Sequence, residues 1–248
     1  MEEAEFTEKL LLFGLGRQEA LLYRCLLQSG ELTGYEAAKL TGISRSNVYN
    51  GLASLTEHGA AYVLEGMPKR YTAVGLEEFC DNRIRYLREV GKQLVKNCPG
   101  PAVESEGYIT VEGYQHVCDK IHHMLLGARE RIYFSASSGF LARWREEIGE
   151  QVRLGRKVVL LSGDTDAVFA GEKELREGII FYEIPSGMKE GREKQVRLII
   201  DSAYVLTGEV EGGSRDTCLY SAQKNFVAVF KDAMRNEIEL VRIREGKA

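Results

Sequence analysis

The sequence predicts an α+β protein of two domains joined by a long helix, and three observations lead to this prediction. Apolar residues recur at helical spacing through most of the first 75 residues, which end in two short β-like runs. One apolar seam then extends from Leu76 to Lys96. Beyond residue 106, strand-like runs alternate with helical segments, which is typical of an α/β domain with a mixed sheet. We therefore expect domains over 1–75 and 106–248, connected by a helix over 76–98.

The bulk composition excludes several classes of protein. Apolar residues make up 44% of the 248 residues and charged residues 28%, an ordinary globular balance. The net charge is −4, so binding to a polyanion requires a local basic patch. No apolar run approaches the roughly 18 residues of a membrane helix, and the acidic N-terminus lacks a signal pattern. Five dispersed cysteines without a CxxC pair indicate reduced thiols. We expect a cytoplasmic protein with no cofactor and no membrane contact.

The first domain begins with helices. Residues 5–13 and 18–28 carry apolar stripes at helical spacing. Thr33 and Glu36 have the spacing of a capping box, which opens a short helix over 34–40.

A second short helix follows after a turn at Gly42, with Ser44 as its expected N-cap. Two β-like runs come next, over 61–65 and 69–74, joined by a turn that contains Gly and Pro. Two short helices joined by a glycine-bearing turn and followed by a hairpin are the pattern of a winged helix-turn-helix.

The helix after Ser44 has a polar outward face. With Val48 at 0° and about 100° per residue, Leu52 and Leu55 lie on the inward side. A merely solvated helix would favour Glu, Lys, Gln and Ala, whereas this one uses Ser, Asn and Gly51. In helix-turn-helix proteins the start of the second helix reaches base edges in the major groove, where Asn suits adenine and Arg suits guanine. The predicted DNA-contacting residues of this helix are Arg45, Ser46, Asn47, Tyr49, Asn50 and Ser54.

The hairpin tip predicts a wing that contacts phosphate through Lys69 and Arg70. From Glu31 to Val74, four acidic residues balance four basic ones, so the module has no net charge. One copy should therefore bind weakly, and affinity would come from a dimer that reads two half-sites.

The seam over 76–96 predicts the contact between the two copies. Apolar residues such as Phe79, Leu87 and Leu94 recur at steps of three and four for about three heptads. A symmetric homodimer is the simplest source of a partner helix, and packing against the same chain is the alternative. Arginines at 83, 85 and 88 are either phosphate contacts or a solvated face.

The second domain carries both kinds of element. Strand-like runs cover 108–111, 131–135, 157–161, 179–184, 195–200, 203–206 and 217–220, and helical patterns cover 114–126, 141–154 and 225–235. The glycine-bearing segment over 185–194 is predicted to be a solvated loop or a lid.

These motifs resemble the TrmB-type transcriptional regulators. The resemblance is carried by FGLGRQEALLYRCLL, ELTGYEAAKLTGISRSNVYNGLASLTEHG, MPKRYTAV and LEEF. The second half, with weaker signals such as VRLIIDSAYVLTGE, is similar to the family's phospholipase D-like effector-binding domain. The resemblance implies a dimeric regulator that binds double-stranded DNA and is modulated by a small molecule, such as a sugar.

The same fold raises an enzyme alternative, a phosphodiesterase with an H-x-K-x(4)-D site. Aligned on Asp201, this chain has Lys194 in place of the His and Val196 in place of the Lys. A protonated Lys is a poor nucleophile and Val cannot bind phosphate, so we predict no enzyme activity. A protein-binding adaptor that has lost DNA contact is a third reading, which the neutral charge leaves open.

Polar residues after strand ends predict the effector site, because ligands of open α/β sheets bind beyond the carboxyl ends of strands. The same residues are also ordinary for loops. A cluster of His116, Cys118, Asp119, His122 and His123 spreads around its helix, so we predict no metal site. The predicted effector-binding residues are Ser135, Ser137, Ser162, Asp164 and Asp201.

Overall fold

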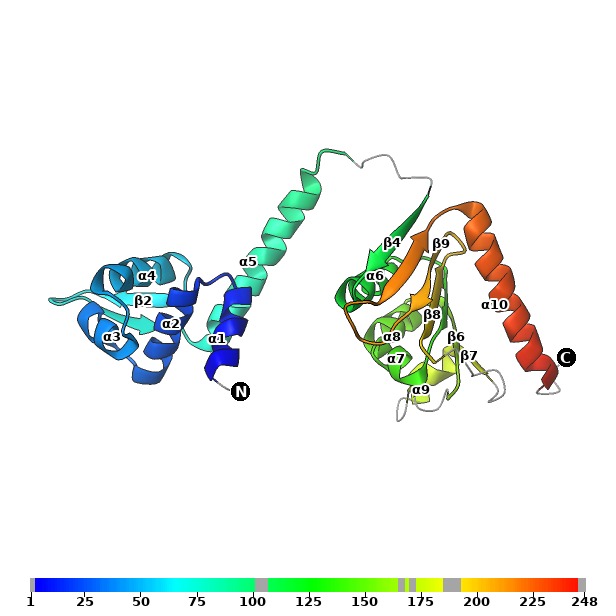
Figure 1. Cartoon of the computed structure of the whole chain (residues 1–248), viewed down its shortest axis with the longest axis horizontal. Helices are drawn as coiled ribbons and strands as arrows, with labels where there is room; N and C mark the ends of the chain where they lie inside the picture. Colours follow the sequence, from blue (N-terminus) through cyan, green and yellow to red (C-terminus); the bar gives the residue numbers. More distant parts are fainter. Residues whose placement is uncertain (1–2, 101–106, 165–167, 170–172, 185–192, 245–248) are drawn as a thin grey trace. The chain divides into compact units, whose positions relative to one another are not determined.

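The fold was analysed in a computed structural model, which describes residues 3–100, 107–164, 168–169, 173–184 and 193–244 (Figure 1). The chain divides into two compact units, residues 1–102 and 103–248. The first unit combines helices with a small sheet, and the second combines helices with a mixed seven-stranded sheet. The predicted α+β class is therefore confirmed.

The first unit is a winged helix-turn-helix followed by one long helix. The wing is the antiparallel hairpin of β2 and β3, and β1 adds a third strand to β3. The sequence did not predict β1, because two residues are too few to show a period. The elements are α1 (Glu3–Leu12), α2 (Arg17–Ser29), β1 (Leu32–Thr33), α3 (Gly34–Thr41), α4 (Arg45–Glu57), β2 (Ala61–Leu64), β3 (Arg70–Ala73) and α5 (Leu76–Lys96).

Local capping signals set the start of both short helices as predicted. The Thr33 hydroxyl accepts from the backbone N–H of Glu36, whose carboxylate accepts from the backbone N–H of Thr33. Gly42, with φ of 69°, ends α3 in the left-handed conformation that glycine adopts without strain. The Ser44 hydroxyl then accepts from Asn47 N–H at 3.4 Å and caps α4. The helix-turn-helix is therefore fixed largely by local chemistry.

The first turns of α5 are fixed to the winged helix. Phe79 is buried and its ring lies 5.2 Å from that of Tyr23 in α2. The Tyr23 hydroxyl donates to the Val74 carbonyl at 2.8 Å, and burial raises its pKa to about 12. Arg83 Nε donates to the Phe13 carbonyl at 2.9 Å. Arg83 is thus a structural contact rather than a phosphate contact.

The second unit is built on a sheet with the strand order β4-β10-β9-β8-β5-β6-β7. Only the β5–β6 and β6–β7 pairs are parallel, so the sheet is mixed, as predicted. The elements are β4 (Tyr108–Glu112), α6 (Tyr114–Leu126), β5 (Arg131–Ser135), α7 (Ser138–Ala142), α8 (Arg145–Arg153), β6 (Lys157–Ser162), α9 (Lys173–Glu177), β7 (Ile179–Glu183), β8 (Gln195–Ile200), β9 (Tyr204–Glu209), β10 (Thr217–Ser221) and α10 (Lys224–Arg244).

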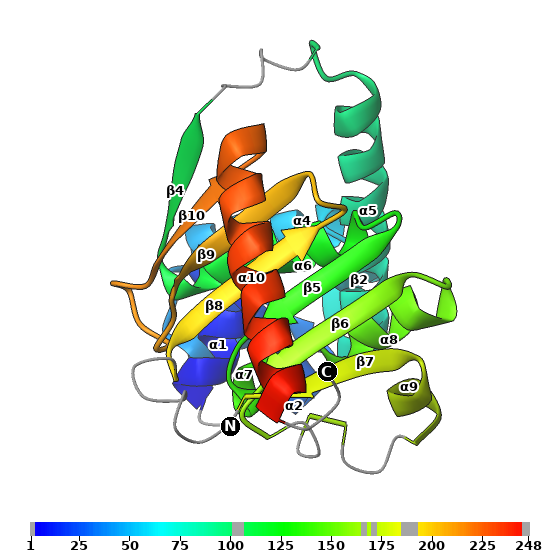
Figure 2. The ribbon, with the colours of Figure 1, turned by 90° about the vertical axis from the view of Figure 1, so that its right-hand side faces the viewer.

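Helices cover both faces of this sheet. Residues of α6, α7 and α8 form one apolar core with one face of the sheet. Residues of α10 form a second apolar core with the opposite face. Figure 2 shows α10 lying across the strands. Two cores on one sheet give three layers.

Two helix predictions in this unit differ from the structure. The segment predicted as one helix over 141–154 is two helices, α7 and α8, separated at Arg143 and Trp144. Buried Leu141, Trp144 and Ile148 keep helical spacing across the break, so the pattern hides it. The C-terminal helix extends to Arg244 because its buried face continues through Glu237 and Val241. Most of the segment over 185–194 lies outside the described residues.

Candidate DNA interface and ligand cavity

The structure places all six predicted residues of α4 away from the core. Val48, Leu52 and Leu55 are completely buried, which fixes the orientation of the helix. Ser54 is half-buried on the third turn. The first two turns therefore offer hydroxyl, amide and guanidinium groups in a form that suits base edges. The exposed members of the set are Arg45, Ser46, Asn47, Tyr49 and Asn50.

Gly51 belongs to the packing of α4 and not to its polar face. It is buried, and a Cβ at this position would lie 2.6 Å from Cδ1 of Leu22 in α2. The close contact between α2 and α4 thus explains why a residue of low helix propensity occupies this position. The sequence argument counted Gly51 as support for a DNA-reading face, and that part of the argument was wrong.

Two tyrosines extend the polar face onto α3. The Arg45 guanidinium lies 4.6 Å from the ring centre of Tyr35, which is a cation–π contact. The Tyr49 ring lies against Gly34, where a Cβ would come within 2.6 Å of its Cε1 atom. Sequence reasoning did not identify Tyr35, although its place in the first turn of α3 was a signal. The first helix of such motifs crosses the DNA backbone, where a phenol can donate to phosphate.

The Gly34 contact leads to a prediction. Gly34→Ala should displace the Tyr49 ring and weaken operator binding, whereas helix stability should not fall because Ala is the better helix former by about 1 kcal/mol. Titration of operator DNA and a urea unfolding curve would measure the two effects. Unchanged operator affinity would show that the position of the Tyr49 ring does not contribute to binding.

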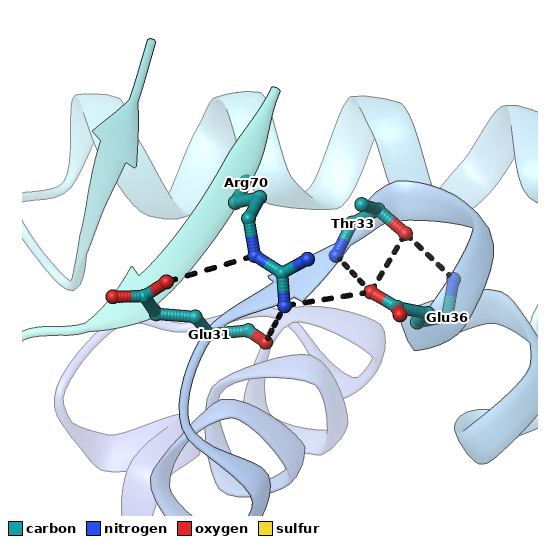
Figure 3. Close-up of polar contacts among 4 residues, drawn as sticks. All are labelled: Glu31, Thr33, Glu36 and Arg70. Atoms are coloured by element: carbon teal, nitrogen blue, oxygen red, sulfur yellow. Dashed lines mark hydrogen bonds and ion pairs between the residues drawn. The ribbon is translucent and has the colours of Figure 1, made fainter. Parts of the chain in front are cut away.

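Arg70 begins β3 at the turn end of the wing, and two glutamates lie beside its side chain (Figure 3). Its Nη2 donates to the Glu31 carbonyl at 2.7 Å, and its Nε lies 3.6 Å from the Glu31 carboxylate. Nη2 also lies 3.9 Å from Glu36 Oε2. Because β3 pairs with β1, this side chain ties the wing to the start of α3. Arg70 therefore has a structural role, and its contact with phosphate stays a prediction.

The Glu36 carboxylate in this cluster gives a pH prediction. Hydrogen bonds from the Thr33 N–H and hydroxyl, together with Arg70, hold the pKa of Glu36 below its ordinary value of 4.5. A lowered folded pKa contributes stability that is complete above about pH 4.5 and is lost as the pH falls through the folded pKa. Glu36→Gln should therefore show a weaker dependence of unfolding midpoint on pH below 4.5. Identical profiles for the two proteins in urea unfolding between pH 6 and 3 would contradict this.

Lys69 keeps the position predicted for a wing cation. Its side chain is exposed, and its Nζ lies 3.4 Å from the exposed Glu65 carboxylate. A surface pair of this kind contributes little, so the lysine can exchange Glu65 for a phosphate. Lys69 therefore remains the predicted phosphate contact of the wing.

A cavity of about 250 Å³ lies where the effector site was predicted, beyond the carboxyl ends of β5 and β6. Ser135, Ser137 and Asp164 line it, which brings three of the five predicted residues together. Arg197 and Gln195 of β8 form another part of its wall. The walls offer hydroxyl, carboxylate and guanidinium groups, which suit a polar ligand.

Ser162 and Asp201 do not line this cavity. Ser162 is completely buried. It shares a strand face with Leu160 and Val158, whereas Ser135 is on the opposite face. Asp201 follows the carboxyl end of β8, which runs antiparallel to β5 and therefore points away from the cavity. The two residues do not join the other three because the sequence does not give the direction or the face of each strand.

Asp201 instead closes a turn. Its carboxylate accepts from the backbone N–H groups of Arg129, Glu130 and Arg131 at 2.8 to 2.9 Å. Burial alone would raise the pKa of Asp201, but these three donors together outweigh it and lower the pKa. The Asp201 carboxylate thus stabilises the turn before β5.

Sequence reasoning missed the ion pair beside the cavity. Arg197 Nη1 lies 2.9 Å from Glu237 Oε2 of α10, and their side chains are only 17% and 8% exposed. Arg197 Nη2 also donates to Gln195 at 3.1 Å. Truncating one partner of such a pair lowers the free energy of unfolding by several kcal/mol, because the other charge is left buried and unpaired. No local pattern could reveal the pair, since 40 residues separate its members.

The residues considered for metal binding and for hydrolase chemistry lie at separate places in the fold. Among them, no three His, Cys, Asp or Glu side chains come together as a metal site. His122 instead pairs with Glu147 at 2.9 Å. Val196, at the lysine position of the hydrolase motif, is buried in the core, and Lys194 pairs with Glu211. No described helix is long and apolar enough to cross a membrane.

Comparisons with known proteins place the first unit in a family context. A family model described as the sugar-specific transcriptional regulator TrmB matches residues 10–77. The chain is 28% identical over 148 residues to the HTH-type sugar sensing transcriptional regulator TrmBL1 of Pyrococcus furiosus, which covers 57% of this chain and 43% of the relative. It is 24% identical over 232 residues to the uncharacterized protein YrhO of Bacillus subtilis, which covers 91% of this chain and 81% of that protein. The chain thus spans less than half the length of TrmBL1.

Two solved structures are similar to this chain over different shares of its length. TrmBL2, described as an archaeal chromatin protein with a novel mode of DNA binding, aligns over 96% of this chain and 99% of its own, with 19% identity and a TM-score of 0.45. Nuc from Salmonella typhimurium, a phospholipase D family member, aligns over 53% of this chain and 94% of its own, with 11% identity and a TM-score of 0.40.

Proposed function

We propose that this chain, a TrmB-type transcriptional regulator, binds a specific operator as a homodimer and changes its affinity when a small molecule binds the second unit. The family match over residues 10–77 confirms the resemblance predicted from the helix-turn-helix motifs. The observation that carries the proposal is the exposed polar face of α4, with Arg45, Asn47 and Asn50 on its first two turns. Residues 1–75 act as the DNA-binding domain, 76–98 as the dimerisation helix and 106–248 as the effector domain.

Support for the dimer comes from α5. Its first turns are fixed to the winged helix, but Ile84, Leu87 and Leu94 are 39%, 48% and 68% exposed. With the small Gly91 between them, they form a stripe at heptad spacing, which suits a second helix of the same kind. A neutral DNA-binding module also needs two copies to reach useful affinity. We call these four residues the α5 stripe.

Support for the effector comes from the cavity beside Ser135, Ser137 and Asp164. Its volume of about 250 Å³ suits a small polar molecule, and sugars are the first class to test. The buried Arg197–Glu237 pair joins one wall of the cavity to α10, so a ligand there contacts the residues that position this helix.

Two experiments test these steps separately. A mobility shift with the DNA upstream of the protein's own gene should show a saturable complex that unrelated DNA does not displace. Absence of a complex with either DNA would favour the adaptor reading, and equal binding of both DNAs would contradict a specific operator. A thermal-shift screen with sugars should then find a ligand that raises the melting temperature by on the order of 5 °C at a hundred times its Kd.

Variants assign that ligand to the cavity. Ser135→Leu should abolish the thermal shift by occupying the cavity. Thr217→Leu, on an exposed position of β10, is the control and should keep it. A shift that survives Ser135→Leu would place the ligand elsewhere.

A further inference from the structure

A second cavity of the same unit, of about 340 Å³, lies between α10 and the strands that it covers. It shares no lining residue with the effector cavity. Arg131 and Lys157 on its rim begin the two strands, β5 and β6, whose other ends reach the effector cavity. The two cavities therefore lie toward opposite ends of these strands.

The floor of this second cavity is apolar. Tyr133, Val159 and Ile199 contribute from the sheet, and Met234 and Ile238 contribute from α10. Ile180 of the edge strand β7 also lines the cavity and is 42% exposed. Apolar surface left open in a recess of this size can bind the apolar body of a small molecule.

The rim of the cavity is positively charged, although the whole chain carries −4. Its lining contains one acid, Glu239, so five cations against one anion give +4. Glu130 and Asp232 pair with two of the cations from outside the lining, and counting both acids still leaves +2. The five cations are Arg131, Lys157, Lys231, Arg235 and Arg242.

Two of these cations have no counter-charge within the part of the chain that the structure describes. Lys157 and Lys231 make no ion pair there, although Lys231 is half-buried against the apolar floor. A partly desolvated ammonium without an acid favours an anion from solution. Arg242 is already oriented, because its Nη2 donates to the Tyr182 hydroxyl at 2.9 Å.

We propose that this cavity binds a small amphipathic anion, with a carboxylate, phosphate or sulfonate held at the lysines and an apolar body on the floor. The recessed apolar floor distinguishes the site from a duplex-DNA surface, which needs cations along an open face and no apolar recess. The site is distinct from the effector cavity and does not depend on it. Binding there would place a ligand between α10 and the sheet.

Calorimetry on the full chain with three probes tests the proposal. Octanoate should bind with one site per chain. Octanol has the alkyl chain but no charge, and acetate has the carboxylate but no long alkyl chain. Each should therefore bind at least about tenfold more weakly than octanoate. Absence of octanoate binding, or equal binding of octanol, would overturn the proposal.

Paired variants locate the site. Lys157→Gln with Lys231→Gln should weaken octanoate binding about tenfold or more. Lys96→Gln with Lys224→Gln removes the same charge from exposed positions outside the cavity and should leave binding unchanged. Equal affinities for the two double variants would overturn the assignment. So would a result in which octanoate fails to bind and only the first double variant loses affinity for random duplex DNA, since that marks a nucleic-acid surface.

Discussion

Leu87→Glu is expected to convert the protein into a monomer of 27.8 kDa and to lower operator affinity by about a hundredfold or more. Leu87 lies in the middle of the α5 stripe and is 48% exposed in the single chain, so the new carboxylate would be buried only in a dimer. An unpaired charge in such a contact is strongly unfavourable, and the loss of the second half-site removes the gain from linked binding. Light scattering and operator titration measure the two effects.

A matched control separates this effect from added negative charge. Gln93→Glu introduces the same charge on α5, at an exposed position on the side opposite the stripe. It should leave both the mass and the operator affinity near those of the original chain. A Leu87→Glu protein that remains dimeric would rule out the α5 stripe as the dimer contact.

The second large effect is expected at the start of α4. Arg45→Ala and Asn47→Ala should each lower operator affinity by about ten- to a hundredfold, because a good side-chain contact to a base contributes about 1–3 kcal/mol of discrimination. Affinity for random duplex DNA should change much less. Titrations of both DNAs at one fixed salt concentration measure the difference.

Lys69→Ala is the comparison for these two variants. As a phosphate contact it should weaken binding to both DNAs and lower the slope of log K against log salt by about 1. If Arg45→Ala reduces binding to operator and random DNA equally, Arg45 contacts the backbone and not a base.

Much of the first unit could be predicted from its sequence because local chemistry determines it. The Thr33–Glu36 capping box, the Ser44 cap and the apolar positions of α4 and α5 all act over three or four residues. Rules of that range can be read from one sequence. They predicted the helix-turn-helix, the hairpin and the long helix with bounds close to those observed.

The failures have a common physical origin in contacts between distant segments. The contacts of Arg70 with Glu31 could not be predicted because 39 residues separate the two. Gly51 was misread because the Leu22 side chain that excludes a Cβ belongs to another helix. Asp201 was placed in the wrong part of the sheet because antiparallel pairing of β8 reverses which end meets the cavity. Ser135, Ser137 and Asp164 line one cavity, as the sequence predicted, because β5 and β6 are parallel neighbours.

The attachment of α5 to the winged helix has a mechanical consequence. Phe79 and Arg83 hold the first two turns of α5 to α2 and to Phe13, which follows α1. The proposed dimer helix and the proposed DNA-reading helix should therefore move together. In a dimer with half-sites about 34 Å apart, each reading helix would lie about 17 Å from the dimer axis. A rotation of about 10° between the two α5 helices would then shift the two reading helices relative to each other by about 3 Å, close to one base-pair step. Half-site spacing is then set by the crossing angle of the α5 helices. Arg83→Gln, which loosens this attachment, should make operator affinity less sensitive to a one-base-pair insertion between half-sites, and an unchanged sensitivity would show that Arg83 does not transmit the angle.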